Sequence, residues 1–184
     1  LVAHAFGCSR FAMMLAGPRL RVVLATTHLA LRDVPAAVTG DAVFDAGDLV
    51  AAFLQEHMGI ARPRLAVLGL NPHASDNGRF GDEEARVIAP AVARLVAAGR
   101  DASGPLPADT AFPRAATGGY DAVVAMYHDQ GLGPLKLLHF HDAINVTLGL
   151  PILRTSVDHG TAFDIAGKGV ANADSLVDAV EYGM

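Results

Sequence analysis

The sequence predicts an α/β fold in which a mostly parallel or mixed sheet is covered by helices on both faces. Apolar runs rich in Val and Leu recur at residues 21–27, 64–70, 121–127 and 144–150. These runs are continuous rather than alternating, as expected for strands that are buried on both faces. Helical patterns lie between the runs, and strands that alternate with helices are typical of this fold class.

Three helices are expected in the intervening segments, over residues 41–58, 82–98 and 174–182. Each has an acidic residue near its start and a glycine directly after its end, which is the usual chemistry of helix termini. Neither an internal repeat nor a low-complexity tract interrupts this pattern. A chain of 184 residues can form one compact domain or a large part of a two-domain protein.

Composition and charge argue against several classes of function. The formal net charge is −5 and Lys and Arg form no block, so we expect neither a nucleic-acid partner nor an anionic membrane surface. Charged residues interrupt the apolar runs before they reach the length of a membrane span, and a secretory leader pattern is missing. Cys8 is the single cysteine, which excludes an internal disulfide and a Cys-rich metal site. We expect a cytoplasmic protein.

Three of the predicted strands are followed by a histidine: His28, His73 and His128. In open α/β sheets, ligands bind beyond the carboxyl ends of the strands, so these imidazoles are candidates for one crevice or one interface. Three neutral histidines leave a divalent metal an open coordination position for substrate. The alternative is that each is an ordinary hydrogen-bonded loop residue. Spacing alone leaves both interpretations open, because no short ligand motif such as HExxH is present.

Further polar groups follow or lie within the later apolar runs. Lys136 and Arg154 are candidates to bind a phosphate or a carboxylate, and Asn145 lies inside a strand pattern. Taken singly, each could equally be a solvated surface group. The segment 155–176 is rich in small residues and turns, which allows a nucleotide to approach the backbone closely. The GxGxxG dinucleotide fingerprint is absent.

Five stretches form long motifs: TTHLALRDV, GLNPHA, SGPLPADT, AMYHDQGLGPLK and NVTLGLPILRTSVDHGTAFDIAGKG. Together they resemble the 4-hydroxythreonine-4-phosphate dehydrogenase family of pyridoxal phosphate biosynthesis. The resemblance implies a metal-dependent, NAD(P)-linked oxidation of 4-phosphohydroxy-L-threonine, followed by loss of carbon dioxide to give 3-amino-2-oxopropyl phosphate. It also implies a three-layer sandwich like isocitrate and isopropylmalate dehydrogenases, with two domains around a cleft, and a homodimer with an active site shared between subunits.

The resemblance also assigns roles to residues. The metal ligands of the family fall on His28, His73 and His128, and its substrate-binding residues fall on Lys136, Asn145 and Arg154. The family builds its metal site from both subunits, with His128 expected from the partner. A similarity to the nucleotide-binding loop of isopropylmalate dehydrogenases places five residues near the adenosine of the cofactor: His159, Gly160, Thr161, Ala162 and Asn172. Asp109 and Asp129 are the candidates to accept the hydroxyl proton or to orient a ligand.

The chain departs from the family pattern in two places. A glycine-rich PGEPAGIGPE-like turn and a GHTE-like phosphate motif are absent and are expected to precede Leu1. We therefore expect residues 1–150 to form the substrate, metal and dimerisation domain, and residues 151–184 to return to an incomplete cofactor domain. The family motif NPHAGE reads NPHASD here, with Ser75 and Asp76 beside a candidate ligand.

Two other functions remain open from the sequence. Related dehydrogenases act on sugar-acid phosphates such as threonate or erythronate 4-phosphate, or on dihydrodiol dicarboxylates, and they share the three histidines. The chain could also be a non-catalytic metal-binding or dimerisation module. Zinc is the first expectation for the metal, with magnesium, manganese, cobalt or nickel as alternatives. The choice between NAD and NADP is open. We expect the remaining histidines to be surface or packing residues: His4, His57, His139 and His141.

Overall fold

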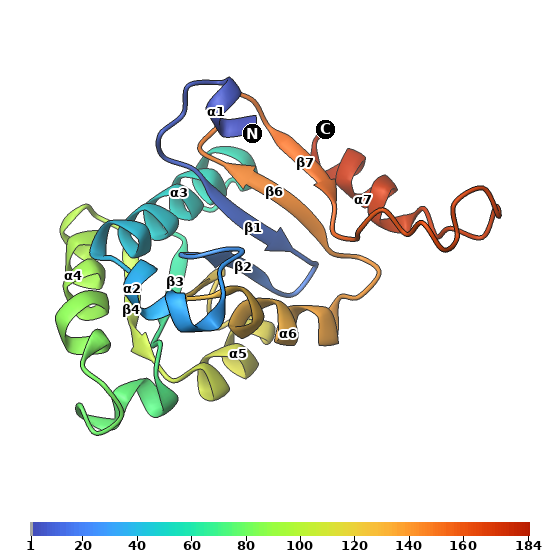
Figure 1. Ribbon diagram of the computed structural model, residues 1–184. Coiled ribbons are helices and arrows are strands. Elements are labelled where there is room, and N and C mark those ends of the chain that lie inside the picture. Colours follow the sequence, from blue (N-terminus) through green and yellow to red (C-terminus); the bar gives the residue numbers. More distant parts are fainter. Residues whose placement is uncertain (1) are drawn as a thin grey trace.

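The computed structural model describes residues 2–184, which form a mixed seven-stranded sheet with helices on both faces (Figure 1). The strands are β1 (Ala12–Ala16), β2 (Arg21–Leu24), β3 (Arg64–Leu68), β4 (Asp101–Leu106), β5 (Ala122–Ala125), β6 (Ile144–Leu148) and β7 (Arg154–Val157). Their order across the sheet is β4-β3-β5-β2-β1-β6-β7. β4, β3, β5 and β2 run parallel, whereas β1, β6 and β7 pair antiparallel with their neighbours. The predicted α/β class is confirmed.

The helices connect these strands. They are α1 (Val2–Ala5), α2 (Val34–Ala37), α3 (Gly40–Met58), α4 (Ala89–Ala97), α5 (Ala108–Ala116), α6 (His128–Leu138) and α7 (Asp174–Tyr182). Three further turns are helical: η1 (Leu31–Asp33), η2 (Pro72–Asp76) and the π-helical η3 (Glu84–Ile88). In residues 2–184, no helix is both long and apolar enough to cross a membrane.

Two hydrophobic cores lie on opposite faces of the sheet. Leu65 and Val67 of β3 pack into the core under α3 and α4, whereas Ala66 and Leu68 pack into the core under α5 and α6. Both sets of side chains are fully buried. This burial on both faces explains why the strand reads as one continuous apolar run.

The four predicted strands are present, but they end earlier than the apolar runs. The runs 21–27, 64–70 and 121–127 leave the ladder after Leu24, Leu68 and Ala125, and their last residues form the edge from which the candidate site is built. The sequence analysis missed β1, β4 and β7. β7 has the polar sequence RTSV and lies at the edge of the sheet, partly exposed along its length, so it has no apolar run to detect.

The three predicted helices also form, with α7 over its expected range and α3 beginning one residue earlier than expected. Thr39 is the N-cap of α3, and its side chain accepts a hydrogen bond from the Ala42 N–H. Gly59 ends α3 in the left-handed conformation, with φ +66°. Gly183 behind α7 is right-handed instead, with φ −88°. The helix expected over 82–98 is divided into a π-helical turn and α4. α5 and α6 were not predicted, and each contains an internal proline that obscures its pattern.

Candidate functional site

The parallel strands β3, β5 and β2 are neighbours, so the chain leaves all three at the same edge of the sheet. His73 follows β3, His128 follows β5 and begins α6, and His28 follows β2. The inference that three strands deliver a histidine at one end of the sheet therefore agrees with the topology. Whether the imidazoles meet depends on the loops that carry them.

His28 and His128 lie side by side. Their ring centroids are 5.3 Å apart and their planes are tilted by 46°. Both line a cavity of about 440 Å³, together with Tyr127 and Asp129. The structure therefore brings two of the three predicted metal ligands together within a single chain.

The carboxylate of Asp129 orients the ring of His128. Its Oδ1 lies 2.7 Å from Nδ1 of His128. If Nδ1 carries the proton and donates it to this carboxylate, Nε2 keeps its lone pair for a ligand bond, which is the usual arrangement of metal-binding histidines. The other candidate carboxylate, Asp109, is exposed in the first turn of α5 and does not line this cavity. The structure thus places Asp129, and not Asp109, at the histidine pair.

His73 does not join this pair. In the part of the chain that the structure describes, no three His, Cys, Asp or Glu side chains lie close enough to hold one ion. His73 begins a run of five consecutive non-glycine residues with positive φ, between +47° and +75°, and Gly78 continues it at φ +87°. Left-handed backbone costs roughly 1–2 kcal/mol for each residue that is not glycine, and such strain concentrates at functional sites.

Side-chain hydrogen bonds hold this strained turn in place. The Ser75 hydroxyl donates to the Gly81 carbonyl at 2.6 Å and accepts from the Gly78 N–H at 2.8 Å. Ser75 therefore adopts a positive φ with its hydroxyl satisfied where the family motif has glycine. Glu84, which is 4% exposed, accepts hydrogen bonds from the backbone N–H groups of Leu70 and Asn71. The sequence analysis missed Glu84 entirely.

Two of the three predicted substrate-binding residues line a second cavity, of about 500 Å³, which also reaches His28. Asn145 lies on β6 and Arg154 on the neighbouring β7. The Asn145 Oδ1 is buried and has no hydrogen-bond partner among residues 2–184. Arg154 donates to the Thr147 hydroxyl at 2.9 Å, and no carboxylate of the described chain forms an ion pair with it. A guanidinium and an unpaired amide oxygen thus face the cavity that contains His28.

Lys136 does not reach this cavity. Its Nζ lies 3.0 Å from the Asp158 carboxylate, donates to the Asp158 carbonyl at 2.8 Å, and lies 5.6 Å from the ring centroid of Phe140. Its charge is therefore paired, and the side chain connects α6 to the start of the segment that follows β7. Within one chain Lys136 thus lies apart from Asn145 and Arg154, and its role in substrate binding stays a prediction.

The predicted cofactor loop projects from the body of the protein between β7 and α7 (Figure 1). Its five candidate residues are exposed, and none lines either cavity described above: His159, Gly160, Thr161, Ala162 and Asn172. Ala162 has φ +48°, and the Asn172 Oδ1 accepts a hydrogen bond from the Asp174 N–H at the start of α7. Their role in cofactor binding stays a prediction.

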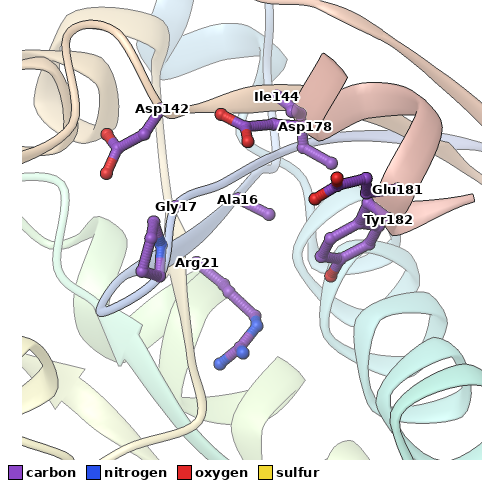
Figure 2. Close-up of a pocket in the computed structure, with 9 residues that line it drawn as sticks. Ala16, Gly17, Arg21, Asp142, Ile144, Asp178, Glu181 and Tyr182 are labelled. Carbon is purple, nitrogen blue, oxygen red and sulfur yellow. The ribbon is translucent and has the colours of Figure 1, made fainter. Parts of the chain in front are cut away.

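A third cavity, of about 240 Å³, lies at the opposite end of β2, beneath α7 (Figure 2). The carboxylates of Asp142, Asp178 and Glu181 line it, together with Arg21 and Tyr182. Burial raises the pKa of Tyr182, and the positive charge of Arg21 partly offsets this rise. The cavity contains none of the predicted site residues, because Arg21 begins the strand that ends toward His28.

Comparison with known proteins identifies the family. The family model described as pyridoxal phosphate biosynthetic protein PdxA matches residues 1–183. The 4-hydroxythreonine-4-phosphate dehydrogenase of Desulfosudis oleivorans is 56% identical over 185 residues, covering 100% of this chain and 55% of the relative. The enzyme of the same name from Geobacter metallireducens is 58% identical over 180 residues, covering 98% of this chain and 53% of the relative.

Solved structures agree with this result. A 4-hydroxythreonine-4-phosphate dehydrogenase from Klebsiella pneumoniae superimposes with a TM-score of 0.90 at 47% identity, covering 100% of this chain and 56% of that one. A terephthalate 1,2-cis-dihydrodiol dehydrogenase from Burkholderia xenovorans gives a TM-score of 0.81 at 35% identity, covering 98% and 58%. The chain spans about half the length of these relatives. The match over nearly all of its residues shows that the chain belongs to the PdxA family of pyridoxal phosphate biosynthetic proteins.

Proposed function

We propose that the protein acts as a 4-hydroxythreonine-4-phosphate dehydrogenase, which oxidises 4-phosphohydroxy-L-threonine with NAD or NADP and releases carbon dioxide to give 3-amino-2-oxopropyl phosphate. The observation that carries this proposal is the pair of cavities that meet at His28. One contains a pair of imidazoles, and the other contains a guanidinium and an unpaired amide oxygen. These groups suit a divalent metal and an anionic substrate, respectively.

The histidine pair fits a divalent metal. Zinc binds imidazole nitrogen at about 2 Å with tetrahedral angles, so two rings on one ion have centroids roughly 5 Å apart. The observed separation of 5.3 Å matches this value. Zinc is the first choice, and magnesium, manganese, cobalt and nickel remain alternatives. When bound, such an ion supplies Lewis-acid stabilisation of negative charge on substrate oxygens.

The residues of the second cavity would bind and orient the substrate. The planar fork of Arg154 suits the phosphate or the carboxylate of 4-phosphohydroxy-L-threonine. The buried Oδ1 of Asn145 is an acceptor for the substrate's ammonium or hydroxyl group, which would satisfy an oxygen that has no partner in the described chain. Asp129 would orient the ring of His128 through its hydrogen bond with Nδ1. Lys136 remains a candidate substrate ligand only if it leaves Asp158, and Asp109 remains a candidate base.

A third metal ligand would come from a second protomer. We place His28 and His128 of one protomer opposite His73 of its partner, because the first two are already adjacent. The competing arrangement, expected from the family resemblance, has His128 crossing between subunits. In both arrangements the dimer shares its site. The cofactor would bind at the loop that contains His159 and Asn172, within a two-domain cleft like that of isocitrate and isopropylmalate dehydrogenases.

Replacing His28, His73 or His128 with Ala should weaken metal binding at least tenfold, because each change removes one donor of a three-ligand site. Metal content after dialysis and affinity by competition with a chelator measure this change in the full-length protein. His57→Ala is the control, because His57 is an exposed residue at the end of α3, where its ring packs at a tilt against Phe53. A triple variant that retained stoichiometric metal would contradict the site.

Mixed dimers identify which histidines share a protomer. Co-expressed His73→Ala and His128→Ala chains should regain one intact site in each mixed dimer. Co-expressed His28→Ala and His128→Ala chains should regain none if both residues serve the same site from one protomer. Recovery of activity in the second mixture would instead support the arrangement in which His128 crosses to the partner.

A second candidate substrate class is favoured by a specific comparison. The similarity to a terephthalate dihydrodiol dehydrogenase shows that this fold also occurs in an enzyme named for a dihydrodiol. Arg154 could bind a carboxylate as readily as a phosphate. Turnover with 4-phosphohydroxy-L-threonine, with threonate and erythronate 4-phosphates, and with a dihydrodiol dicarboxylate would distinguish these functions. An absence of turnover with all of them, despite metal binding, would favour a non-catalytic module.

A further inference from the structure

We propose that Gln130 is a positioning residue, which fixes the separation between the strand end that carries His128 and the strand end that leads to His73. This inference rests on the proposed function, because the separation matters only if these histidines serve a metal site. Gln130 itself lines neither of the two cavities that meet at His28.

The side chain of Gln130 continues the sheet where its backbone ladder stops. The pairing between β3 and β5 ends at Val67 and Val124. Beyond this point the Gln130 Nε2 donates to the Gly69 carbonyl at 2.8 Å, and its Oε1 accepts from the Met126 N–H at 2.7 Å. A carboxamide has the same donor and acceptor as a peptide group, so it can join two diverging strand ends as one more rung of the ladder.

The end of β2 joins the same series of hydrogen bonds through Met126, which directly follows β5. The carbonyl of Met126 accepts hydrogen bonds from the Thr26 backbone N–H at 3.2 Å and from the Thr26 hydroxyl at 2.7 Å. Thr26 is 6% exposed, and it lies just before His28. A continuous series of hydrogen bonds therefore joins the ends of β2, β5 and β3, and Gln130 makes the step between the last two.

Gln130 connects this series of hydrogen bonds to the two segments that carry His128 and His73. It lies in the first turn of α6, which begins at His128, so the same side chain anchors the turn that presents that imidazole. On the β3 side, the N–H groups of Leu70 and Asn71, directly after Gly69, are held by the buried Glu84. A shift of Gly69 would therefore move the start of the turn that carries His73.

The test uses Co²⁺ as the probe metal in the full-length protein. Gln130→Met removes both hydrogen bonds at similar side-chain length, and Gln130→Glu keeps the acceptor for Met126 but puts a carboxylate oxygen against the Gly69 carbonyl. Gln55→Met is the matched control, because Gln55 Nε2 donates to the Ala61 carbonyl at 3.1 Å beyond the end of α3. The measurements are Co²⁺ affinity by competition, the visible absorption spectrum of the bound ion, and the melting temperature of the metal-free protein.

We expect both Gln130 variants to bind Co²⁺ roughly tenfold more weakly than the wild type and to change its spectrum, because the segments that carry His128 and His73 would no longer be held at a fixed separation. The control should keep the wild-type affinity and spectrum at a comparable melting temperature. Wild-type affinity and spectrum in both Gln130 variants would overturn this inference and leave the proposed function intact. Failure of the wild type to bind Co²⁺, or an unchanged spectrum in His73→Ala, would overturn both. If Gln130→Met does not fold, Gln130→Glu decides.

Discussion

At the scale of single residues, Arg154 is the clearest candidate for recognition of an anionic substrate. Its guanidinium faces the cavity at His28 and has a hydroxyl, not a carboxylate, as its partner in the described chain. Lysine keeps the charge but cannot reproduce the planar two-point hydrogen bonding. Arg154→Lys should therefore raise the KM for 4-phosphohydroxy-L-threonine about tenfold, equivalent to roughly 1.4 kcal/mol, and Arg154→Met should raise it further. Steady-state kinetics measures this effect.

The control for this change is Arg62→Met. The side chain of Arg62 is 80% exposed and pairs with Asp101 away from the site, so its loss should leave KM unchanged. Metal affinity should be unaffected in both Arg154 variants, because Arg154 is not among the proposed ligands. An unchanged KM in Arg154→Met would exclude this residue from substrate binding.

Glu84 supports a second prediction at this scale. Glu84→Ala leaves the partly buried N–H groups of Leu70 and Asn71 without their acceptor, and an unsatisfied donor shielded from water costs about 1–3 kcal/mol. We therefore expect the free energy of unfolding to fall by at least 1–3 kcal/mol, measured by urea denaturation. Glu56→Ala, an exposed position on α3, should change it little. Equal stability of the two variants would refute the assigned role of Glu84.

The sequence predicted the location of the candidate site better than its internal geometry. His28, His73 and His128 follow neighbouring parallel strands as expected, because continuous apolar runs identify buried strands and parallel strands end at one edge. Which rings meet depends on the loops, and the left-handed turn at His73 has no sequence signal beyond the Asn77–Gly78 pair at its end. Glu84 did have a signal: it shares a helical face with the buried Ile88 and Leu95.

At the scale of elements, the packing of α6 on β2 can be tested with two glycines of the same helix. A Cβ at Gly131 would lie 2.6 Å from Val22 Cγ1 and 3.1 Å from both Ala125 Cβ and Leu24 Cδ2. A Cβ at Gly133 would meet nothing within 4 Å. Gly131→Ala should therefore destabilise the protein by about 1–3 kcal/mol through overpacking. Gly133→Ala should cost less than this, because its Cβ meets no packed neighbour, although the adjacent Pro134 offsets the helix-favouring effect of alanine.

Thermal or urea unfolding of the two variants measures this difference. Because α6 begins at His128, Gly131→Ala should also weaken metal binding, whereas Gly133→Ala should not. Similar stability of the two variants would show that α6 does not pack against β2 as closely as described.

The elements that the sequence analysis missed share physical causes. α5 and α6 contain Pro113 and Pro134, which are poor helix formers within a helix pattern. β7 is polar because it is a partly exposed edge strand. One of its polar residues, Arg154, lines a cavity. Local sequence patterns report burial, so an element that is partly exposed and contributes to a site is the kind most easily missed.

At the scale of the whole molecule, ion pairs tie distant parts of the chain together. Asp48 on α3 accepts hydrogen bonds from Arg10, which precedes β1, and from Arg100, which precedes β4. Asp121 and Arg64 join the starts of β5 and β3, with two side-chain hydrogen bonds of 3.0 Å. Burial tends to raise the pKa of both carboxyls, but the hydrogen bonds and charges of the arginines outweigh it and hold each pKa below its ordinary value.

These two carboxylates should make the fold sensitive to acid. A carboxyl group whose pKa is lower in the folded state stabilises the protein above its unfolded pKa of about 4, and this stabilisation is lost as the pH falls through the folded pKa. Asp121→Asn should therefore be less stable than the wild type at pH 7, and the difference should shrink as the pH falls below about 4. Urea unfolding as a function of pH measures it, with Asp33→Asn as the exposed control. A difference that stayed constant from pH 7 into the acid range would mean that the charge of Asp121 is not what joins β3 to β5, and that packing alone holds this end of the sheet.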